Sequence, residues 1–380
     1  MSSETVNRSR PRTLEEAKAW MHDKLAKRVH PLGLTDPRVT AELIDQLKGL
    51  DGDNWAKVWG GAGAGHAEQA AAAERAGNLD EAQRLYLQAY GFYFLGRFPC
   101  PNHPSKLECY RQEREAYVNA GRLMTPPIRR VTVPFEGRAG EGTEVVLYVR
   151  RPDGVSRPKV VVMWGGVDAW KEEMTELSNG LLARGLATVA MDNVGTGESP
   201  VVAVPDADRQ FIPVLDWVAS QSDLDGTWPA ILGRSFGGYW ATKLAHLYPN
   251  RLAAAVSWGG GAHFMFQRSW VEASRQPESY LMELVETRSR MLGATNDAEY
   301  IDRFAKLSLI DQQLLDRPCA PLLLVNGKED RQCPIDDIFL LLDHGRPKSV
   351  RLFPGGHMGF GPHTVPTIVD WVSERLGGKA

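Results

Sequence analysis

A serine flanked by glycines is the clearest candidate for chemistry in this chain. Gly233, Ser235 and Gly237 form the pattern G-x-S-x-G, which is typical of a nucleophile held on a sharp turn between a strand and a helix. The apolar run 228–232 before it predicts the strand, and residues 239–247 after it predict the helix. Glycines on both sides prevent clashes at such a strained turn. We therefore expect the Ser235 hydroxyl to project toward a substrate.

An acid and a histidine follow the serine in the order that nucleophilic catalysis requires. A serine hydroxyl is a weak nucleophile unless a base removes its proton and an acid orients that base. Asp330 stands in the turn after the apolar run 321–326, and His357 stands in a glycine-rich loop after the run 349–353. This order predicts Ser235 as the nucleophile, His357 as general base and then general acid, and Asp330 as the orienting carboxylate.

Nearby residues offer alternatives for the acid and the base. Glu329 and Asp336 are the alternatives to Asp330, whose carboxylate could instead cap its own turn. His363 is the alternative to His357, which could be an exposed loop histidine. His357 is favoured because it directly follows the last predicted strand.

Two backbone N–H groups must face the oxygen that becomes negative when the serine attacks a carbonyl. Phe236, directly after the nucleophile, is expected to supply one. The other is expected from the loop 164–168, where Val167 is favoured over Gly166 as the donor. Asp168 ends this loop, and its carboxyl could hold a substrate hydroxyl, move a proton or bind a cationic group. Capping the next helix is the alternative role for Asp168.

Several further side chains could line a substrate pocket. Our candidates for substrate contact are Asp168, Gly166, Arg234, His263 and Phe264. The other imidazole and aromatic residues that could reach the pocket, or could equally belong to a packed core, are His66, His103, Tyr86, Tyr90, Phe94, Phe266 and Trp270.

The composition argues against several functional classes. The chain has 380 residues and a formal net charge of −3, which argues against a nucleic-acid-binding protein. We find no apolar run of membrane-spanning length and no apolar signal core at the N-terminus. The four cysteines, Cys100, Cys109, Cys319 and Cys333, lack C-x-x-C spacing and are expected to be reduced thiols in a cytoplasmic protein. No His/Cys cluster has the spacing of zinc ligands, so we expect no metal. The turn 195–197 lacks the lysine of a phosphate loop and is read as a strand-end turn, so we expect no cofactor.

The N-terminal third of the chain is predicted to be helical. Residues 1–125 are predicted to form a helical domain, which opens with the capping box that Thr13 and Glu16 form. The predicted helices are 13–29, 41–50, 66–75, 79–94 and 105–120. The two helices around Gly77 resemble a single tetratricopeptide unit, which is too few for an array. Two prolines at 126–127 mark the boundary.

Residues 126–380 are predicted to form an α/β domain, since strands alternate with helices. The predicted strands are 130–135, 144–151, 159–164, 186–192, 230–233, 252–258, 321–326 and 349–353. The predicted helices are 172–183, 207–221, 238–248, 335–342 and 365–375. We expect an eight-stranded, mostly parallel sheet with an antiparallel hairpin at one edge. The helical stretch 263–313 exceeds a single crossover and is predicted to be an insertion over the carboxyl ends of the strands, where ligands bind.

In combination these motifs resemble the α/β-hydrolases of the dihydroxypseudooxynicotine hydrolase type. That group is related to the fungal yellowish-green pigment polyketide-shortening hydrolases and, more distantly, to the fermentation-respiration switch protein. The segments that carry the resemblance are 233–238, 257–260, 165–168, 171–173, the turns of Asp330 and His357, Trp59 and 96–99. It implies the α/β-hydrolase fold, a helical cap, often a dimer, and hydrolysis of a carbon–carbon bond next to a ketone. One departure is Asp168, where members with the most similar loop carry the longer glutamate.

The residues and the resemblance together predict a cofactor-independent serine hydrolase. Its expected substrate is a small aromatic or polyketide-like ketone, cleaved at a carbon–carbon bond through an acyl-enzyme. The alternatives are a carboxylesterase with the same triad, an eliminase or cyclase in which His357 and Asp168 transfer protons, and a non-catalytic binding protein. We expect a homodimer with a small-molecule substrate and with neither a nucleic acid nor a membrane as partner.

Overall fold

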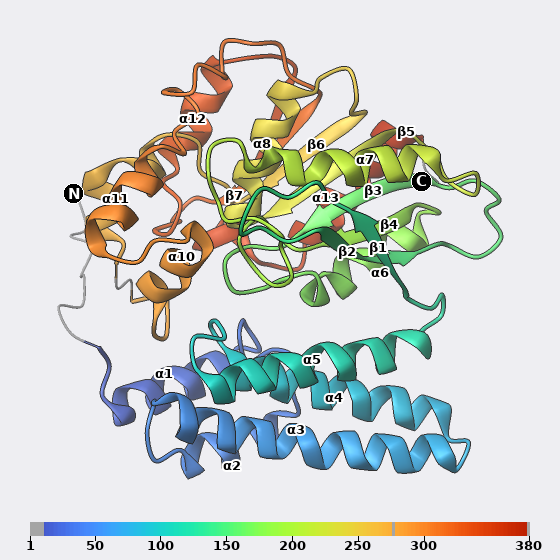
Figure 1. Cartoon of the computed structure of the whole chain (residues 1–380), viewed down its shortest axis with the longest axis vertical. Helices are drawn as coiled ribbons and strands as arrows, with labels where there is room; N and C mark the ends of the chain where they lie inside the picture. The colour runs from blue at the N-terminus through green and yellow to red at the C-terminus, as the bar shows by residue number, and fades with distance from the viewer. Residues whose placement is uncertain (1–10, 276–277, 378–380) are drawn as a thin grey trace. The chain divides into compact units, whose positions relative to one another are not determined.

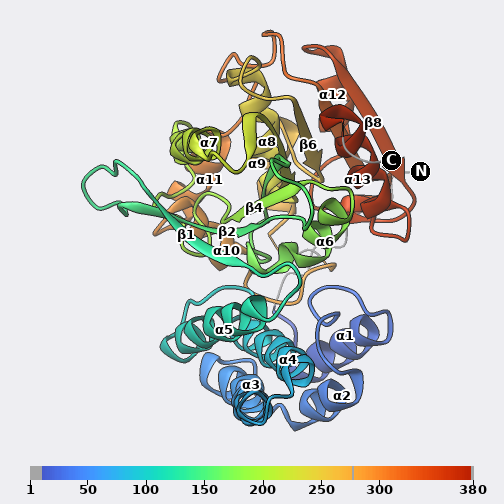
Figure 2. The same cartoon turned by 90° about the vertical axis from the view of Figure 1, so that its right-hand side faces the viewer.

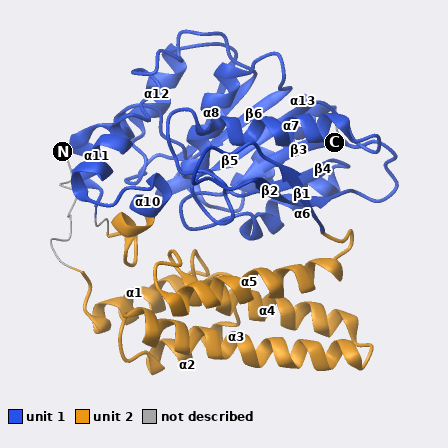
Figure 3. Ribbon diagram, viewed as in Figure 1, with its two compact units in different colours: residues 1–5, 129–277, 288–380 blue, residues 6–128, 278–287 orange. Residues whose placement is uncertain are grey.

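The computed structural model describes residues 11–275 and 278–377, and these fall into two compact units (Figure 3). The helical unit contains the described residues of 6–128 and 278–287, and the sheet unit contains those of 129–277 and 288–380. Residues 1–10 of the predicted N-terminal domain lie outside the described residues. No helix among the described residues is long and apolar enough to cross a bilayer.

The helical unit is built around a strongly buried central helix. Its helices are α1 (Leu14–Ala26), α2 (Pro37–Gln46), α3 (Gly52–Arg75), α4 (Leu79–Arg97) and α5 (Pro104–Arg122). The predicted capping box of α1 is confirmed, because the Glu16 N–H donates to Thr13 Oγ1 and the Thr13 N–H donates to the Glu16 carboxylate. Helix α4 packs against both α3 and α5 and is the most buried helix of the unit.

Helix α3 begins fourteen residues earlier than the sequence predicts. The sequence predicts a helix only from His66, whereas the structure has α3 starting at Gly52. Glycine disfavours a helix by about 1 kcal/mol relative to alanine, and this first half is glycine-rich. Close packing explains the helix, since a Cβ on Gly63 would lie 2.8 Å from the Tyr93 ring. The glycine lets α4 approach the α3 backbone, and this tertiary contact outweighs local propensity.

The segment 278–287 groups with the helical unit, although the sequence places it inside domain 126–380. Polar contacts explain the grouping. Lys106 Nζ, which is buried, donates to the Glu283 carboxylate at 2.6 Å. The Arg12 guanidinium donates to three backbone carbonyls of the segment. The compact units therefore differ from the predicted domain limits at this segment.

The sheet unit contains the predicted eight-stranded, mostly parallel sheet. Its strands are β1 (Arg129–Pro134), β2 (Glu144–Arg150), β3 (Lys159–Trp164), β4 (Ala187–Met191), β5 (Asp225–Arg234), β6 (Ala254–Trp258), β7 (Leu322–Gly327) and β8 (Lys348–Phe353). They are ordered β1-β2-β4-β3-β5-β6-β7-β8. Strand β2 runs antiparallel to both its neighbours, and β3 to β8 are paired in parallel. The antiparallel pair β1–β2 lies at the edge, as predicted.

Helices cover both faces of this sheet. Helices α6 (Thr175–Ala183) and α13 (Thr364–Leu376) lie on one face, and α7 (Phe211–Ser220) and α8 (Phe236–Leu247) lie on the other (Figure 2). Helix α12 (Asp336–Asp343), labelled in Figure 1, precedes β8 along the chain. The predicted insertion after β6 holds α9 (Arg268–Ala273), α10 (Leu284–Leu292) and α11 (Asp297–Ala305). Short 3-10 turns are η1 (Glu172–Met174), η2 (Ala207–Gln210), η3 (Phe264–Phe266) and η4 (His357–Gly359).

Strand register brings the candidate loops to one edge of the sheet. Trp164 at the end of β3 pairs with Gly233 of β5, and Arg234 pairs with Trp258 at the end of β6. Strands β7 and β8 end together, with Gly327 opposite Phe353. Carboxyl ends of parallel strands form the ligand-binding edge of such sheets. The loops with the predicted serine, acid and histidine therefore start from neighbouring strand ends.

Candidate active site

Ser235 occupies a strained turn between β5 and α8. Its backbone has φ +55° and ψ −127°, a left-handed region that costs a non-glycine residue of order 1–3 kcal/mol. Its N–H donates to the Trp258 carbonyl at 2.6 Å. A Cβ on Gly237 would lie 2.2 Å from the Gly165 carbonyl oxygen, so only glycine fits there. This is the strand–turn–helix geometry that the G-x-S-x-G pattern predicts.

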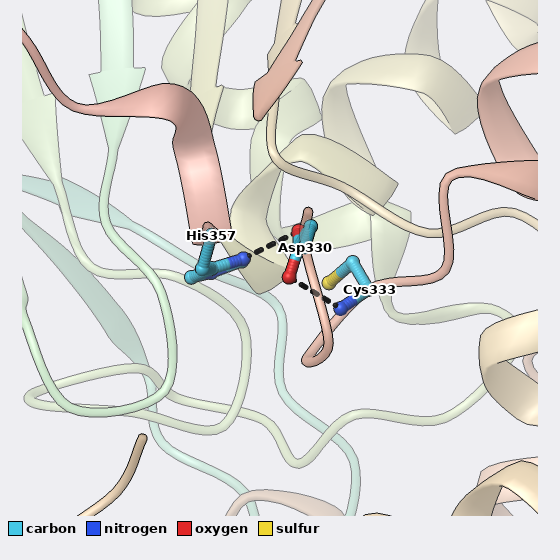
Figure 4. Close-up of side chains that lie close together, drawn as sticks. All are labelled: Asp330, Cys333 and His357. Atoms are coloured by element: carbon cyan, nitrogen blue, oxygen red, sulfur yellow. Dashed lines mark hydrogen bonds and ion pairs between the residues drawn. The ribbon is translucent and has the colours of Figure 1, made fainter. Parts of the chain in front are cut away.

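The structure brings Ser235, His357 and Asp330 into one line of hydrogen bonds. Ser235 Oγ lies 2.7 Å from His357 Nε2. On the other side of the ring, His357 Nδ1 lies 2.8 Å from Asp330 Oδ2 (Figure 4). In the tautomer that suits both distances, the serine hydroxyl donates to Nε2 and Nδ1–H donates to the carboxylate. Such an arrangement can pass the serine proton to the imidazole.

Asp330 is held in its charged form despite being buried. Burial raises the pKa of Asp330, but the charge and hydrogen bond of His357, with the Asn326 and Cys333 hydrogen bonds, outweigh it and hold this pKa below its ordinary value. Oδ1 accepts the N–H groups of Gln332 at 2.7 Å and Cys333 at 3.1 Å. Oδ2 also accepts Asn326 Nδ2 at 2.8 Å. A charged carboxylate is the form that orients an imidazole.

The alternative acids and base lie in less suitable places. Glu329, Asp336 and His363 are all exposed or partly exposed. Asp336 begins α12, and His363 directly precedes α13. The geometry therefore favours Asp330 and His357 over these three residues.

Asn326 is a positioning residue that the sequence reasoning missed. It is buried at the end of β7 and joins the two loops that hold the acid and the histidine. Its Nδ2 donates to Asp330, while its Oδ1 accepts the backbone N–H of Met358 at 2.9 Å and of Gly327 at 2.8 Å. The sequence signal that could have indicated this role is a polar residue, Asn326, at the end of the otherwise apolar run 321–325.

The backbone N–H groups expected at the oxyanion lie on both sides of the serine. Phe236 is the first residue of α8, and an N–H in the first turn has no acceptor within its helix. The Gly166 N–H donates to the Ala169 carbonyl at 2.8 Å, which favours Val167 as the donor. A Cβ on Gly166 would lie 2.7 Å from Ser235 Cβ and 3.1 Å from its Oγ. The loop after β3 therefore lies directly against the serine side chain.

This close approach predicts the effect of Gly166→Ala. The added methyl group must push the loop or Ser235 away, so the oxyanion donor and the nucleophile lose their alignment. We expect kcat/KM to fall about 100-fold, and the forced contact to cost about 1–3 kcal/mol of stability. The control is Gly61→Ala, where a Cβ would meet nothing within 4 Å and activity should not change. Equal activity in the two variants would contradict the placement of this loop.

Arg234 ends β5 directly before the serine, and Asp168 lies in the loop after β3; the two have different surroundings. The Arg234 guanidinium lies 5.8 Å from the Trp258 ring centre and 5.2 Å from that of Phe360, distances at which cation–π attraction acts. Asp168 is buried in the loop after β3. The position that directly precedes η1 is held by Lys171. Substrate contact by either residue stays a prediction.

His263 and Phe264 are held by a buried carboxylate. Their N–H groups both donate to Asp337 Oδ1 at 2.8 Å, and burial raises the pKa of Asp337. The His263 ring lies 2.7 Å from Ser308 Oγ. Phe264 is 39% exposed. These contacts fix the turn after β6, and substrate binding by the two side chains stays a prediction.

Each of the other aromatic and imidazole candidates has a packing or hydrogen-bond partner in its own unit. Phe266 is buried against Phe236, Tyr239 and Phe304, and Trp270 Nε1 lies 3.3 Å from the Gln332 carbonyl. Within the helical unit, the partners are Glu74 for Tyr86, Tyr117 for Tyr90, Phe98 for Phe94, Phe92 for His66 and Ser105 for His103. These contacts favour the packing role that the sequence left open.

The turn 195–197 lies against the buried carboxylate of Asp192. Lys171 Nζ lies 2.7 Å from Asp192, 2.9 Å from Glu198 and 3.1 Å from Glu172. The Glu198 N–H also donates to Asp192 at 2.7 Å, and burial raises the pKa of Asp192. A buried ion cluster thus fixes the loop after β4, as expected for a strand-end turn.

Comparisons with known proteins agree with this fold. A family described as "Esterase FrsA-like" matches residues 33–376. Esterase FrsA of Photobacterium profundum is 26% identical over 348 residues, which cover 90% of this chain and 81% of that protein. 2,6-Dihydropseudooxynicotine hydrolase of Paenarthrobacter nicotinovorans is 29% identical over 237 residues, or 58% of this chain and 63% of that protein. The latter match spans less than two thirds of the relative.

A solved structure shows the same fold over nearly the whole chain. The crystal structure of 2,6-dihydroxy-pseudo-oxynicotine hydrolase superposes with a TM-score of 0.77 and covers 95% of this chain and 97% of that one. Sequence identity is 22%, so this similarity shows the fold alone.

Proposed function

Because the chain belongs to the FrsA-like esterase family of α/β-hydrolases, we propose that it is a serine hydrolase whose nucleophile is Ser235. The observation that carries this proposal is the unbroken hydrogen-bonded line from Ser235 Oγ through His357 to Asp330, with distances of 2.7 and 2.8 Å. A binding protein has no need of these three groups in this order and geometry.

The geometry supports a two-step reaction. His357 Nε2 takes the proton of Ser235 as Oγ attacks the substrate carbonyl, and the N–H groups of Phe236 and Val167 hold the oxyanion. His357 then gives that proton to the leaving group, and an acyl-enzyme remains on the serine. Water, deprotonated by His357, then attacks the acyl carbon. The bond to Ser235 Oγ breaks, His357 returns the proton to Oγ, and the acid is released. Asp330 keeps the imidazole oriented throughout.

For the substrate we propose a small aromatic or polyketide-like ketone cleaved at a carbon–carbon bond. The hydrolase relative that is 29% identical is named for a pseudooxynicotine substrate. That name supports the proposal that the substrate is a ketone. The leaving carbon would depart as an enolate or an electron-rich aryl carbon and would take its proton from His357. Asp168, in the loop against Ser235, is our candidate for holding a substrate hydroxyl or cationic group.

The second candidate is a carboxylesterase with the same triad. The family description and the relative covering most of this chain both carry the word esterase. The chemistry before deacylation differs only in the leaving group, which would be an alkoxide rather than a carbon.

One experiment tests both candidates. The wild-type protein is treated with a fluorophosphonate, and the modified peptide is identified by mass spectrometry. Untreated protein is assayed on aryl β-diketones and short p-nitrophenyl esters. We expect labelling at Ser235 and a higher kcat/KM for diketones. Comparable values for esters would favour the esterase, and absence of both labelling and turnover would favour a binding protein.

We also predict a helical cap formed by residues 1–125 and 263–313, a homodimer, and a cytoplasmic location.

A further inference from the structure

One cluster of metal-ligating side chains stands out among the described residues. Asp330, Cys333 and His357 each offer one ligand atom, and these atoms all lie within 4.8 Å of one another (Figure 4). Spacing in the sequence does not predict it, because His357 joins the other two residues only through the fold. We propose that this cluster is a binding site for a thiophilic divalent cation such as Zn²⁺, and that the bound cation switches the serine off.

The positions of the three groups suit a tetrahedral cation. Zn²⁺ binds thiolate sulfur at about 2.3 Å and imidazole nitrogen or carboxylate oxygen at about 2.0–2.2 Å, so such ligand atoms lie roughly 3.5 Å apart. A shift of about 1 Å closes the site from the separations present. The Cys333 N–H donates to Asp330 Oδ1 at 3.1 Å, which holds the thiol on the same turn as the acid. The Met265 sulfur, 3.5 Å from the Cys333 sulfur, is a second soft donor at this place.

The charges and protons also balance. Without a cation, the buried Cys333 keeps its proton as an ordinary thiol does near neutral pH, and the hydrogen bonds that join Ser235, His357 and Asp330 are unbroken. A bound cation displaces the thiol proton to solvent, and the thiolate and the Asp330 carboxylate then neutralise its two positive charges.

The imidazole must change its tautomer when the cation binds. The proton on His357 Nδ1 moves to Nε2 as Nδ1 becomes a ligand. Nε2 then donates instead of accepting, so it cannot take the proton of Ser235. Because the His357 side chain is 16% exposed whereas that of Asp330 is fully buried, a cation reaches the cluster from the histidine side.

Zinc chloride and the full-length chain test this site directly. After removal of metal with EDTA, zinc bound at equilibrium dialysis and the rate of fluorophosphonate labelling are both measured. We expect one zinc per chain, labelling slowed at least tenfold, and full recovery on adding EDTA. Absence of zinc uptake overturns the site, and uptake with undiminished labelling overturns the switch.

Matched cysteine variants assign the ligand. Cys333→Ser and Cys333→Ala should bind zinc at least about tenfold more weakly, since even partners of metal ligands contribute that much. Cys319→Ser is the control, because Cys319 is also a buried thiol of the sheet unit. Circular dichroism melts check folding of all three variants. Equal zinc affinity in the Cys333 and Cys319 variants overturns the site.

A serine variant separates this inference from the proposed hydrolase function. Ser235→Ala removes the proposed nucleophile but none of the three ligands, so it should bind zinc as the wild type does. Zinc uptake that depends on Cys333 supports the site even if Ser235 proves not to be the nucleophile.

Discussion

Replacing Ser235 with alanine is expected to lower kcat by about 10⁴- to 10⁶-fold and to abolish fluorophosphonate labelling. The hydroxyl hydrogen-bonded to His357 Nε2 at 2.7 Å is the group that forms the acyl-enzyme. Substrate affinity should change little, because alanine leaves the loops on both sides in place. A small residual rate should remain from the oxyanion donors alone. The measurements are steady-state kinetics on the best substrate and mass spectrometry of the treated protein.

The control for this substitution is a serine away from the site. Ser220 is exposed at the end of α7, and its hydroxyl donates to the Trp217 carbonyl. Ser220→Ala should keep wild-type turnover and labelling. Full turnover in Ser235→Ala would contradict covalent catalysis and favour proton transfer by His357 and Asp168, as in an eliminase or cyclase.

Local signals were sufficient to predict the sheet and the line of three candidate residues. Strands with continuous apolar sequence, such as β3 and β7, can be recognised because they are buried on both faces. The serine, acid and histidine can be found because each directly follows a strand, and the strand ends of a parallel sheet share one edge. Propensity and order along the chain carry all of this information.

Contacts between distant segments could not be predicted in the same way. The glycine-rich start of α3 is helical because Gly63 packs against Tyr93, and no local pattern indicates that partner. Segment 278–287 groups with helices that precede it by more than 150 residues through ion pairs such as Lys106–Glu283. The Asn326 bridge also depends on tertiary pairing. Residues that act only through such contacts carry no motif of their own.

Asp330→Asn is expected to lower kcat at neutral pH by about 10⁴-fold. The carboxylate accepts His357 Nδ1–H at 2.8 Å and so keeps the proton off Nε2. An asparagine can present its NH₂ group to Nδ1, which favours the tautomer with the proton on Nε2. That tautomer cannot accept the proton of Ser235, so the base is lost although the shape of the site is kept.

A matched carboxylate provides the control for this change. Asp336 is the nearby alternative acid and begins α12. Asp336→Asn should keep wild-type kcat, and a larger loss there than in Asp330→Asn would assign the orienting acid to Asp336. Both variants are compared on the same substrate.

The stability of Asp330→Asn should depend on pH in a defined direction. The pKa of Asp330 in the folded protein is held below its ordinary value of 3.8. A carboxyl with a lowered folded-state pKa stabilises the protein fully above the unfolded-state value, and this stabilisation is lost as pH falls through the folded-state value. The wild type should therefore melt at a higher temperature than Asp330→Asn near pH 7, and the difference should shrink below about pH 4. A difference that instead grows on acidification would show that the carboxyl is not held in its charged form. Melting curves of both proteins across this range measure the effect, and they report on Asp330 independently of any substrate.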